Sequence, residues 1–309
     1  MPSEAITPDM IAPELRGALA KVPNFPIRSG LLRSIGTALM KRRRPPEVAD
    51  VAIDVLKEPV VVRIYRPKSP RSNGALFWIH GGGYVIASAA IDDVLCAQIA
   101  RDVGVTVVST EYRLAPRHAF PAPLDDCHAA WLWLVEQAGA MGIDPQRIVV
   151  GGMSAGGGLA AALVQRVTDE QGVKPVGQLL MAPMIDDRTG ARTELDPLKH
   201  PVWDNALDRF GWESYLGQEA GLSDAPKYAV PSRRQDLSGL PPAWIGVGSI
   251  ELFHDEDLLY AQRLAAAGVA VEWQVVSGAP HGFEAWGRDT DIGRQHLGKA
   301  IAWLKDRVV

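Results

Sequence analysis

A serine placed between glycines has the setting of a nucleophile. The strand-like run 147–150 leads into Gly152-x-Ser154-x-Gly156, and a helix rich in small residues is expected after it. A serine on such a strand–turn–helix corner projects its hydroxyl away from the sheet, and only glycine lets the backbone bend so closely beside it. Glycine-rich turns after strands also bind phosphate or simply turn, so this pattern alone leaves the role of Ser154 open.

A glycine-rich loop earlier in the chain favours acyl transfer. The buried strand expected at residues 76–79 ends in the run His80-Gly81-Gly82-Gly83-Tyr84. Acyl transfer places a negative charge on the former carbonyl oxygen, and fixed backbone N–H groups stabilise that charge without reorganising. We therefore predict an oxyanion hole whose donors are the N–H groups of Gly82, Gly83 and Ala155.

A serine hydroxyl needs a base at neutral pH, and His281 is the histidine best placed to be that base. It lies in the loop 277–283, directly after the last expected strand and before the final helix. In an open α/β sheet, the loops at the carboxyl ends of the strands build the site. We expect His80 to be a structural hydrogen-bonding residue of the glycine loop. Surface or packing roles are expected for the other five histidines: His118, His128, His200, His254 and His296.

The third member of a serine triad is a carboxylate that holds the tautomer of the imidazole and stabilises its cation. We expect this carboxylate in the loop 248–256. Glu251 comes soon after the preceding strand ends, whereas Asp255 stands where a helix N-cap belongs. We favour Glu251 over Asp255. The chain order Ser154, Glu251, His281 is the order found in α/β-hydrolases.

These residues need a scaffold, and the order of apolar segments predicts one. Strand-like runs alternate with longer helical segments, which is typical of a parallel sheet covered by helices on both faces. About eight strands are expected, at residues 51–55, 60–65, 75–79, 105–109, 147–150, 178–181, 243–247 and 271–275. Expected helices include residues 126–137, 157–168 and 257–267. The predicted fold class is therefore α/β.

Two segments fall outside this alternation. Residues 1 to about 45 have too few apolar positions to form a domain alone, so they must pack on something else. The stretch from about 186 to 230 is richer in Asp, Arg and Pro than its surroundings. We therefore expect a catalytic domain over residues 46–309 that carries residues 186–230 as an insertion.

Four sequence blocks together resemble the hormone-sensitive-lipase-like family of esterases. These blocks are His80-Gly81-Gly82-Gly83, residues 112–116, residues 120–126 and residues 152–157, and the resemblance spans about residues 50–305. It implies an α/β-hydrolase fold with a mostly parallel eight-stranded sheet and a small helical cap, made from residues 1–45 and the insertion at 186–230. It also implies a serine carboxylesterase that hydrolyses short- to medium-chain acyl esters through an acyl-enzyme, without a cofactor. A homodimer through the last strand and helix is compatible with it.

The resemblance implies a substrate pocket under the cap. The residues expected to contact substrate are Tyr84, Met153, Trp203, Phe210, Trp212 and Phe283, with a packing role for the three aromatics of the insertion left open. Three positions depart from the commonest family pattern. Met153 stands where Asp is usual, Arg117 where Glu is usual, and Glu251 where Asp is commoner. The first two flank the site and are expected to bear on specificity.

Other functions fit the chain less well. A ligand-binding, inactive member of the same fold would be marked by loss of the base, whereas Ser154 and His281 are both present. Amide or lactone hydrolysis uses the same residues and stays open. The histidines lack the spacing and the carboxylate cluster of a metal site, so no metal is expected. The turn at 151–154 lacks the glycine order and the lysine of a nucleotide-binding loop.

The composition of the chain limits the partners and the cellular location that we expect. A formal charge of −4 gives no broad positive field for nucleic acid. The basic run 41–44 could contact a membrane or an acidic partner, but we favour the interpretation that it is a solvated helix end. Cys96 and Cys127 are expected to be buried free thiols. The first residues lack the pattern of a signal peptide, and no segment approaches about 18 uninterrupted apolar residues. We therefore expect a cytoplasmic protein without stable membrane insertion, acting on a small-molecule ester.

Overall fold

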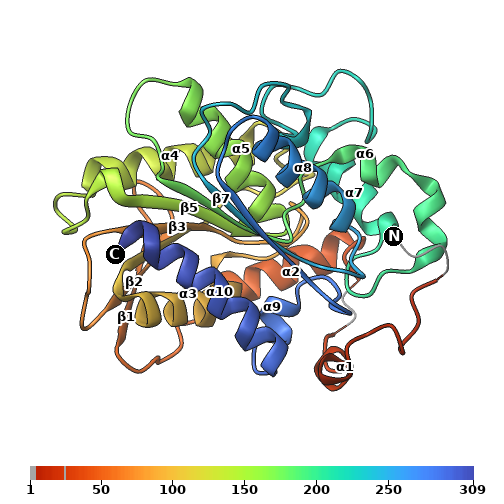
Figure 1. The fold of residues 1–309 in the computed structure, drawn as a ribbon, viewed down its shortest axis with the longest axis horizontal. Helices are drawn as coiled ribbons and strands as arrows, with labels where there is room; N and C mark the ends of the chain where they lie inside the picture. The colour runs from red at the N-terminus through yellow and green to blue at the C-terminus, as the bar shows by residue number, and fades with distance from the viewer. Residues whose placement is uncertain (1–4, 24–25) are drawn as a thin grey trace.

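Residues 5–23 and 26–309, the part that the computed structural model describes, fold around an eight-stranded sheet (Figure 1). The order across the sheet is β1-β2-β4-β3-β5-β6-β7-β8. The strands are β1 (Val51–Leu56), β2 (Val62–Pro67), β3 (Ala75–Ile79), β4 (Thr106–Thr110), β5 (Ile148–Met153), β6 (Gly177–Met181), β7 (Ala243–Gly248) and β8 (Val271–Val276). β2 is antiparallel to both neighbours, and the other pairs are parallel. The predicted mostly parallel sheet is confirmed.

Helices cover both faces of this sheet (Figure 1). One face carries α4 (Ala122–Gln137), α5 (Ala155–Asp169) and α8 (His254–Ala266), and the other carries α3 (Asp93–Ile99) and α10 (Asp291–Val308). Alternation along β3 explains the two layers, because successive side chains of a strand point to opposite faces. Phe77 and Ile79 join the first core, whereas Leu76 and Trp78 join the second. A central strand covered on both sides is therefore apolar throughout.

Helix boundaries differ from the predicted ones in ways that matter for the site. α5 begins at Ala155, directly after Ser154, two residues earlier than expected. α8 begins at His254, and Phe253 occupies its N-cap position. The predicted N-cap role of Asp255 is therefore wrong, because Asp255 already lies within the first turn of the helix. The two cysteines are buried free thiols, as predicted.

Two groups of helices lie outside the layered core. α1 (Pro13–Leu19) and α2 (Gly30–Lys41) precede the sheet, and α1 contacts α9 (Phe283–Trp286) and α10. α6 (Asp187–Ala191), the 3-10 helix Thr193–Leu198 and α7 (Asn205–Leu216) follow β6 and lie at one end of the sheet (Figure 1). The segment 1–45, expected to form the first part of a cap, includes residues 1–4 and 24–25, which are outside the described residues.

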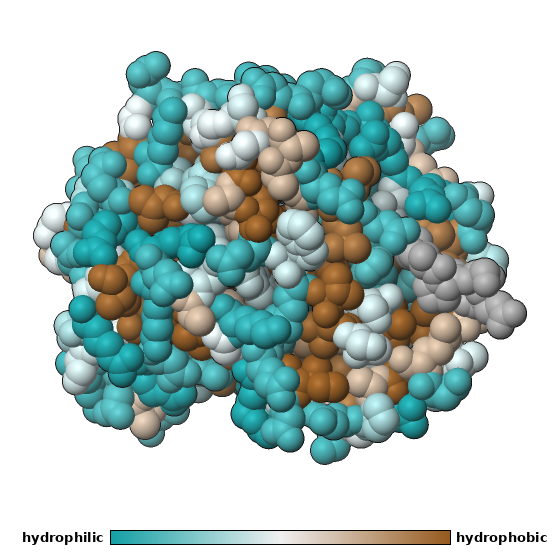
Figure 2. All heavy atoms as spheres, in the orientation of Figure 1, coloured by the Kyte–Doolittle hydropathy of each residue, from teal (hydrophilic) through white to brown (hydrophobic). Residues whose placement is uncertain are grey.

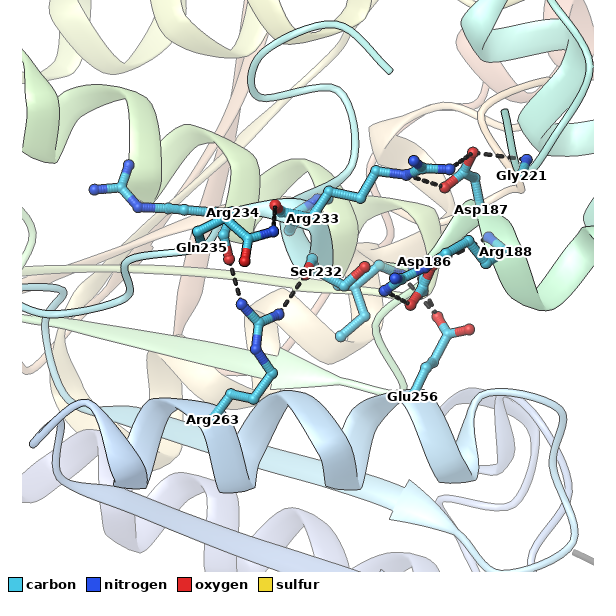
Figure 3. Close-up of polar contacts among 12 residues, drawn as sticks. Asp186, Asp187, Arg188, Gly221, Ser232, Arg233, Arg234, Gln235, Glu256 and Arg263 are labelled. Carbon is cyan, nitrogen blue, oxygen red and sulfur yellow. Dashed lines mark hydrogen bonds and ion pairs between the residues drawn. The ribbon is translucent and has the colours of Figure 1, made fainter. Parts of the chain in front are cut away.

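A buried polar network holds the two ends of the segment 186–230 against α8 (Figure 3). The carboxylate of Asp187, which is fully buried, accepts hydrogen bonds from the Arg233 guanidinium at 2.7 and 2.9 Å and from the N–H of Gly221 at 2.8 Å. From α8, the Glu256 carboxylate accepts a hydrogen bond from the N–H of Ile185 at 2.9 Å. Each bond joins segments far apart in the sequence, so the network fixes where the segment leaves and re-enters the core.

The molecular surface is mostly polar on the face shown in Figure 2, where hydrophobic residues gather in separate patches. Among the described residues, no helix combines the length and the apolar character needed to cross a membrane. Most large apolar side chains lie instead in the cores on the two sides of the sheet.

The ion pair between the buried Asp187 and the partly buried Arg233 gives a test of how the segment 186–230 is held. We expect Arg233→Gln to lower the free energy of unfolding by about 3 kcal/mol, because the Asp187 carboxylate stays buried without its counter-charge. Arg192→Gln is the matched control, since Arg192 pairs with Glu194 at the exposed surface, and it should cost less than about 1 kcal/mol. Urea unfolding followed by circular dichroism measures both. Equal losses in the two variants would contradict the role given to the buried pair.

Candidate active site

Ser154 lies on a sharp turn between β5 and α5, with φ 57° and ψ −127°. This backbone conformation is costly for a residue with a side chain, and the turn persists because glycines surround it. A Cβ atom on Gly152 would collide with the carbonyl of Gly156, and one on Gly156 would collide with the carbonyl of Ile79. The two glycines therefore let α5 start directly under Ser154, where the helix N-terminus favours negative charge.

His281 connects the serine to a carboxylate. Its Nε2 atom lies 2.9 Å from Ser154 Oγ, and its Nδ1 atom lies 3.3 Å from each carboxylate oxygen of Glu251. The loop after β8 carries this histidine, and the indole N–H of Trp286 donates to its carbonyl oxygen at 3.0 Å. The ring of Phe253 packs edge-on against the imidazole, with 5.1 Å between centroids. These contacts fix the imidazole between the serine and Glu251.

The structure separates the two candidate acids. Glu251 is buried, and its Oε1 atom accepts a hydrogen bond from the N–H of Phe253 at 3.2 Å. Asp255 is exposed on the first turn of α8, and its Oδ1 atom lies 2.8 Å from Nδ1 of His254. Of the two carboxylates, Glu251 is therefore the one that contacts His281.

The glycine loop after β3 presents backbone donors beside the serine. Gly82 and Gly83 have φ values of 119° and 57°, which residues with a side chain rarely adopt. The carbonyl of Gly82 accepts hydrogen bonds from the N–H groups of Val85 and Ile86. Within residues 5–23 and 26–309, no protein atom accepts from the N–H of Gly82 or Gly83. Ala155 is the first residue of α5, so its N–H has no partner inside the helix. Within the described part of the chain these three N–H groups are thus unpaired, with Gly82 and Gly83 lining the same cavity as Ser154 and Ala155 directly following it.

His80 lies within the same glycine loop and is fully buried. Its Nδ1 atom is 2.8 Å from the carbonyl oxygen of Gly81. Its ring stacks on Tyr112 with 4.3 Å between centroids, and the Tyr112 hydroxyl donates to the His80 carbonyl at 3.0 Å. Burial lowers the pKa of His80, so the ring is neutral and holds the loop by packing and hydrogen bonding.

A cavity of about 470 Å³ opens over Ser154 and His281. Two of the predicted substrate-contacting residues, Met153 and Trp203, line it. The Trp203 indole N–H donates to Asp208 at 3.3 Å, and its ring lies so close to Gly83 that a Cβ atom there would strike it. Trp203 therefore forms the wall nearest to the glycine loop.

The other four predicted substrate-contacting residues do not line this cavity. Tyr84 is buried: its hydroxyl donates to the Met184 carbonyl at 3.0 Å, and its ring stacks on Tyr215. Phe210 lies under the Arg33 guanidinium, at 5.1 Å from the ring centroid. Trp212 is fully buried in the core on the α4, α5 and α8 side of the sheet, and Phe283 is fully buried in a smaller cluster with Leu15 of α1. For Phe210 and Trp212, the structure therefore favours a packing role, which the sequence had left open beside a substrate role.

Several cavity residues were missed by sequence reasoning. His200, expected in a surface or packing role, is buried and lines the cavity, and within the described residues neither ring nitrogen has a hydrogen-bond partner. The apolar wall further includes Leu19, Val22, Ile27, Ile86, Ile91, Val202, Leu207, Ala285 and Trp286. Ile86, Ile91, Ala285 and Trp286 could have been predicted as cavity residues, because they lie close in sequence to the glycine loop or to His281. The remaining residues belong to no motif.

Two further buried carboxyl groups lie near Glu251. Burial, followed by the charge of Glu251, raises the pKa of Glu284 to about 8. Burial, followed by the charges of Glu256, Glu251 and Glu284, raises the pKa of Asp257 well above its usual range. Burial therefore favours the neutral form of both groups, which limits the negative charge close to Glu251 and the imidazole.

Comparisons with known proteins agree with this geometry. A family model described as the α/β hydrolase fold matches residues 76–285. The esterase LipI of Mycobacterium tuberculosis is 36% identical over 241 residues, which cover 76% of this chain and 74% of the relative. The carboxylesterase NlhH of Mycobacterium tuberculosis is 32% identical over 281 residues, covering 86% of each chain.

A solved structure gives the same result over almost the whole length. A bacterial heroin esterase superposes with a TM-score of 0.87 at 33% identity, covering 98% of this chain and 100% of the other. Fold, site geometry and sequence similarity therefore agree, and the chain belongs to the α/β-hydrolase-fold family, in its hormone-sensitive-lipase-like group of esterases.

Proposed function

We propose that this protein is a serine carboxylesterase in which Ser154 is the nucleophile, His281 the general base and Glu251 the acid that orients it. The observation that carries the proposal is the 2.9 Å contact between His281 Nε2 and Ser154 Oγ on a strained turn. Family membership and the names of the relatives, which are esterases, support the same reaction class. Retention of both serine and base argues against a purely ligand-binding member of the fold.

The geometry supports a two-step mechanism. Ser154 Oγ attacks the ester carbonyl carbon while His281 Nε2 takes its proton, and Glu251 stabilises the imidazolium. The negative charge that develops on the carbonyl oxygen falls among the N–H groups of Gly82, Gly83 and Ala155. His281 then protonates the departing alcohol, which leaves the acyl group on the serine. Water, deprotonated by the same histidine, attacks the acyl-enzyme, and His281 returns the proton to Ser154 Oγ as the bond to the acyl group breaks and the acid leaves.

The walls of the cavity support an uncharged ester as substrate. They are mainly aliphatic and aromatic, and burial lowers the pKa of His200, the histidine in the wall. A cavity of about 470 Å³ has room for short- to medium-chain acyl groups. Amide or lactone hydrolysis uses the same residues, and no feature of the cavity favours it over ester hydrolysis.

The segments 1–45 and 186–230 together form the proposed cap, because both supply residues to the walls of the cavity. Leu19, Val22 and Ile27 come from the segment 1–45, and Val202, Trp203 and Leu207 come from the segment 186–230. Both segments therefore contribute walls above the serine, which is the part that a cap plays in covering a substrate. A homodimer and a cytoplasmic location stay predictions from the sequence.

Replacement of the nucleophile or the base tests the central proposal. We expect Ser154→Ala and His281→Ala to lower kcat for p-nitrophenyl butyrate by about 10⁴-fold or more, because the residues act as one unit. His118→Ala, which removes a histidine outside the cavity, should keep wild-type activity. Release of p-nitrophenol measures all of them after circular dichroism has shown that they fold. A folded wild type that hydrolyses no acetyl, butyryl, octanoyl or lauroyl ester would refute the esterase proposal.

The acid is tested by isosteric amides. Glu251→Gln should lower kcat by about 10³- to 10⁴-fold, because an amide can neither fix the productive tautomer nor stabilise the imidazolium. Asp255→Asn should stay within about twofold of the wild type, because Asp255 faces solvent and pairs with His254. The same assay measures both variants. If the two lost activity equally, the assignment of Glu251 would not hold.

The oxyanion loop is tested by a single methyl group. Gly83→Ala should lower kcat by about 10²- to 10³-fold with less effect on KM, because a Cβ atom would strike Trp203 and shift the donors. Gly139→Ala is the matched control, since nothing lies within 4 Å of the added Cβ atom. Initial rates over a range of p-nitrophenyl butyrate concentrations separate kcat from KM. An unchanged kcat in Gly83→Ala would remove Gly83 from the proposed oxyanion hole.

A further inference from the structure

Helix α2 presents its apolar side to solvent. Leu31, Ile35 and Leu39, spaced four residues apart, are 72%, 47% and 64% exposed. Residues four apart lie on one face of a helix, and the other exposed apolar residues of α2, Leu32 and Ala38, fall on the same arc. The inward side carries Arg33, Gly36, Thr37 and Met40. A surface helix normally has the opposite arrangement, with the apolar stripe toward the core.

The inward side of α2 is held by a buried cation. Arg33 is only 9% exposed, and its guanidinium donates to the carbonyl of Ile27 at 2.6 Å and lies over the Phe210 ring. Turning the helix to bury its leucines would break these contacts. The exposed apolar face is therefore a defined feature of the fold.

A cluster of positive charge adjoins this face. Residues 15–46 contain eight Lys and Arg and no Asp or Glu, although the whole chain carries a net charge of −4. Lys41, Arg42, Arg43 and Arg44 follow one another at the end of α2, and all four are exposed. Lys41 lies 3.8 Å from Glu111, whereas the three arginines form no ion pair with any described residue. The face thus combines exposed apolar side chains with uncompensated cations.

The face also lies beside the mouth of the substrate cavity. Ile27, three residues before α2 begins, lines the cavity. The 3-10 helix Ala89–Asp92 contacts α2, and its Ile91 is 50% exposed and lines the cavity as well. An apolar surface seated on α2 would therefore lie next to the entrance through which an ester reaches Ser154.

We propose that α2 and the basic residues 41–44 dock the protein on an anionic lipid surface. The apolar face of α2 would enter the boundary between head groups and acyl chains, to a depth of about 5–10 Å, while the cations attract anionic head groups. This is reversible adsorption, in keeping with the absence of any membrane-crossing helix among the described residues. The proposal goes beyond ester hydrolysis and does not depend on it.

Charge decides between a lipid surface and a second copy of the chain. A symmetric dimer places the same patch of both subunits together, so the basic runs 41–44 of both copies would enter one interface without an acidic partner from residues 15–46. Like charges at that contact repel, whereas anionic head groups are complementary to them. The observations therefore favour lipid.

Co-sedimentation with vesicles tests the proposal. We expect the wild type to pellet with phosphatidylcholine vesicles that contain phosphatidylserine, and at least about tenfold less with pure phosphatidylcholine or in 1 M NaCl. The triple variant Leu31→Gln, Ile35→Gln, Leu39→Gln should lose at least about tenfold in partitioning, as should Arg42→Gln, Arg43→Gln, Arg44→Gln. Glutamine keeps the helix propensity. The control is Leu132→Gln, Leu259→Gln, which removes two half-exposed leucines from α4 and α8 and should bind as the wild type does.

Hydrolysis of dissolved p-nitrophenyl butyrate should be unchanged in the two triple variants, because none of the six residues lines the cavity. The pelleting assay needs no turnover, so a protein that failed to hydrolyse esters would still test lipid docking. Absence of wild-type pelleting, or equal pelleting of wild type and leucine variant, would overturn the proposal. It would also be overturned by a wild-type dimer in analytical ultracentrifugation that the leucine variant abolishes without any effect of vesicles.

Discussion

The turn at Ser154 is the constraint on which the rest of the site depends. Its backbone has a conformation that a serine adopts only when the structure around it leaves no alternative. That structure is α5 packed directly on the end of β3, an approach that a side chain at Gly156 would prevent. The same close packing brings the glycine loop after β3 beside the serine. The close contact between α5 and the end of β3 therefore positions both the nucleophile and the oxyanion donors.

The carboxylate side of the site depends on burial. Glu251 contacts His281 from a position that is almost fully buried, and it receives one backbone N–H bond there. Such a carboxylate would repel other charged acids nearby, yet Glu284 and Asp257 are also buried. Burial raises the pKa of both, which favours their neutral form. Three acids can thus share one interior region because burial shifts two of them toward the neutral form.

Residues fixed by backbone requirements were predictable, and residues that depend on tertiary packing were not. The glycines around Ser154 and in the loop at Gly82 mark conformations that few other residues adopt, so their positions in the chain identify the turns. The strands followed from apolar runs, and Glu251 followed from its distance after β7. Tyr84 and Phe283, by contrast, flank motif residues yet point into the core. Nothing in the local sequence distinguishes an aromatic that lines a cavity from one that packs beneath it.

Helix α2 shows the same limit in another form. Apolar residues spaced like Leu31, Ile35 and Leu39 usually form the buried side of a surface helix, whereas the structure buries Arg33. Periodicity identifies an amphipathic helix but not which side meets the protein, because that depends on the partners available, here the carbonyl of Ile27 and the ring of Phe210. Local preference and tertiary packing usually agree in a folded protein, and places where they disagree are often functional. The disagreement in α2 lies beside the cavity mouth and a run of cations, which is why we assign the face to a surface outside the molecule.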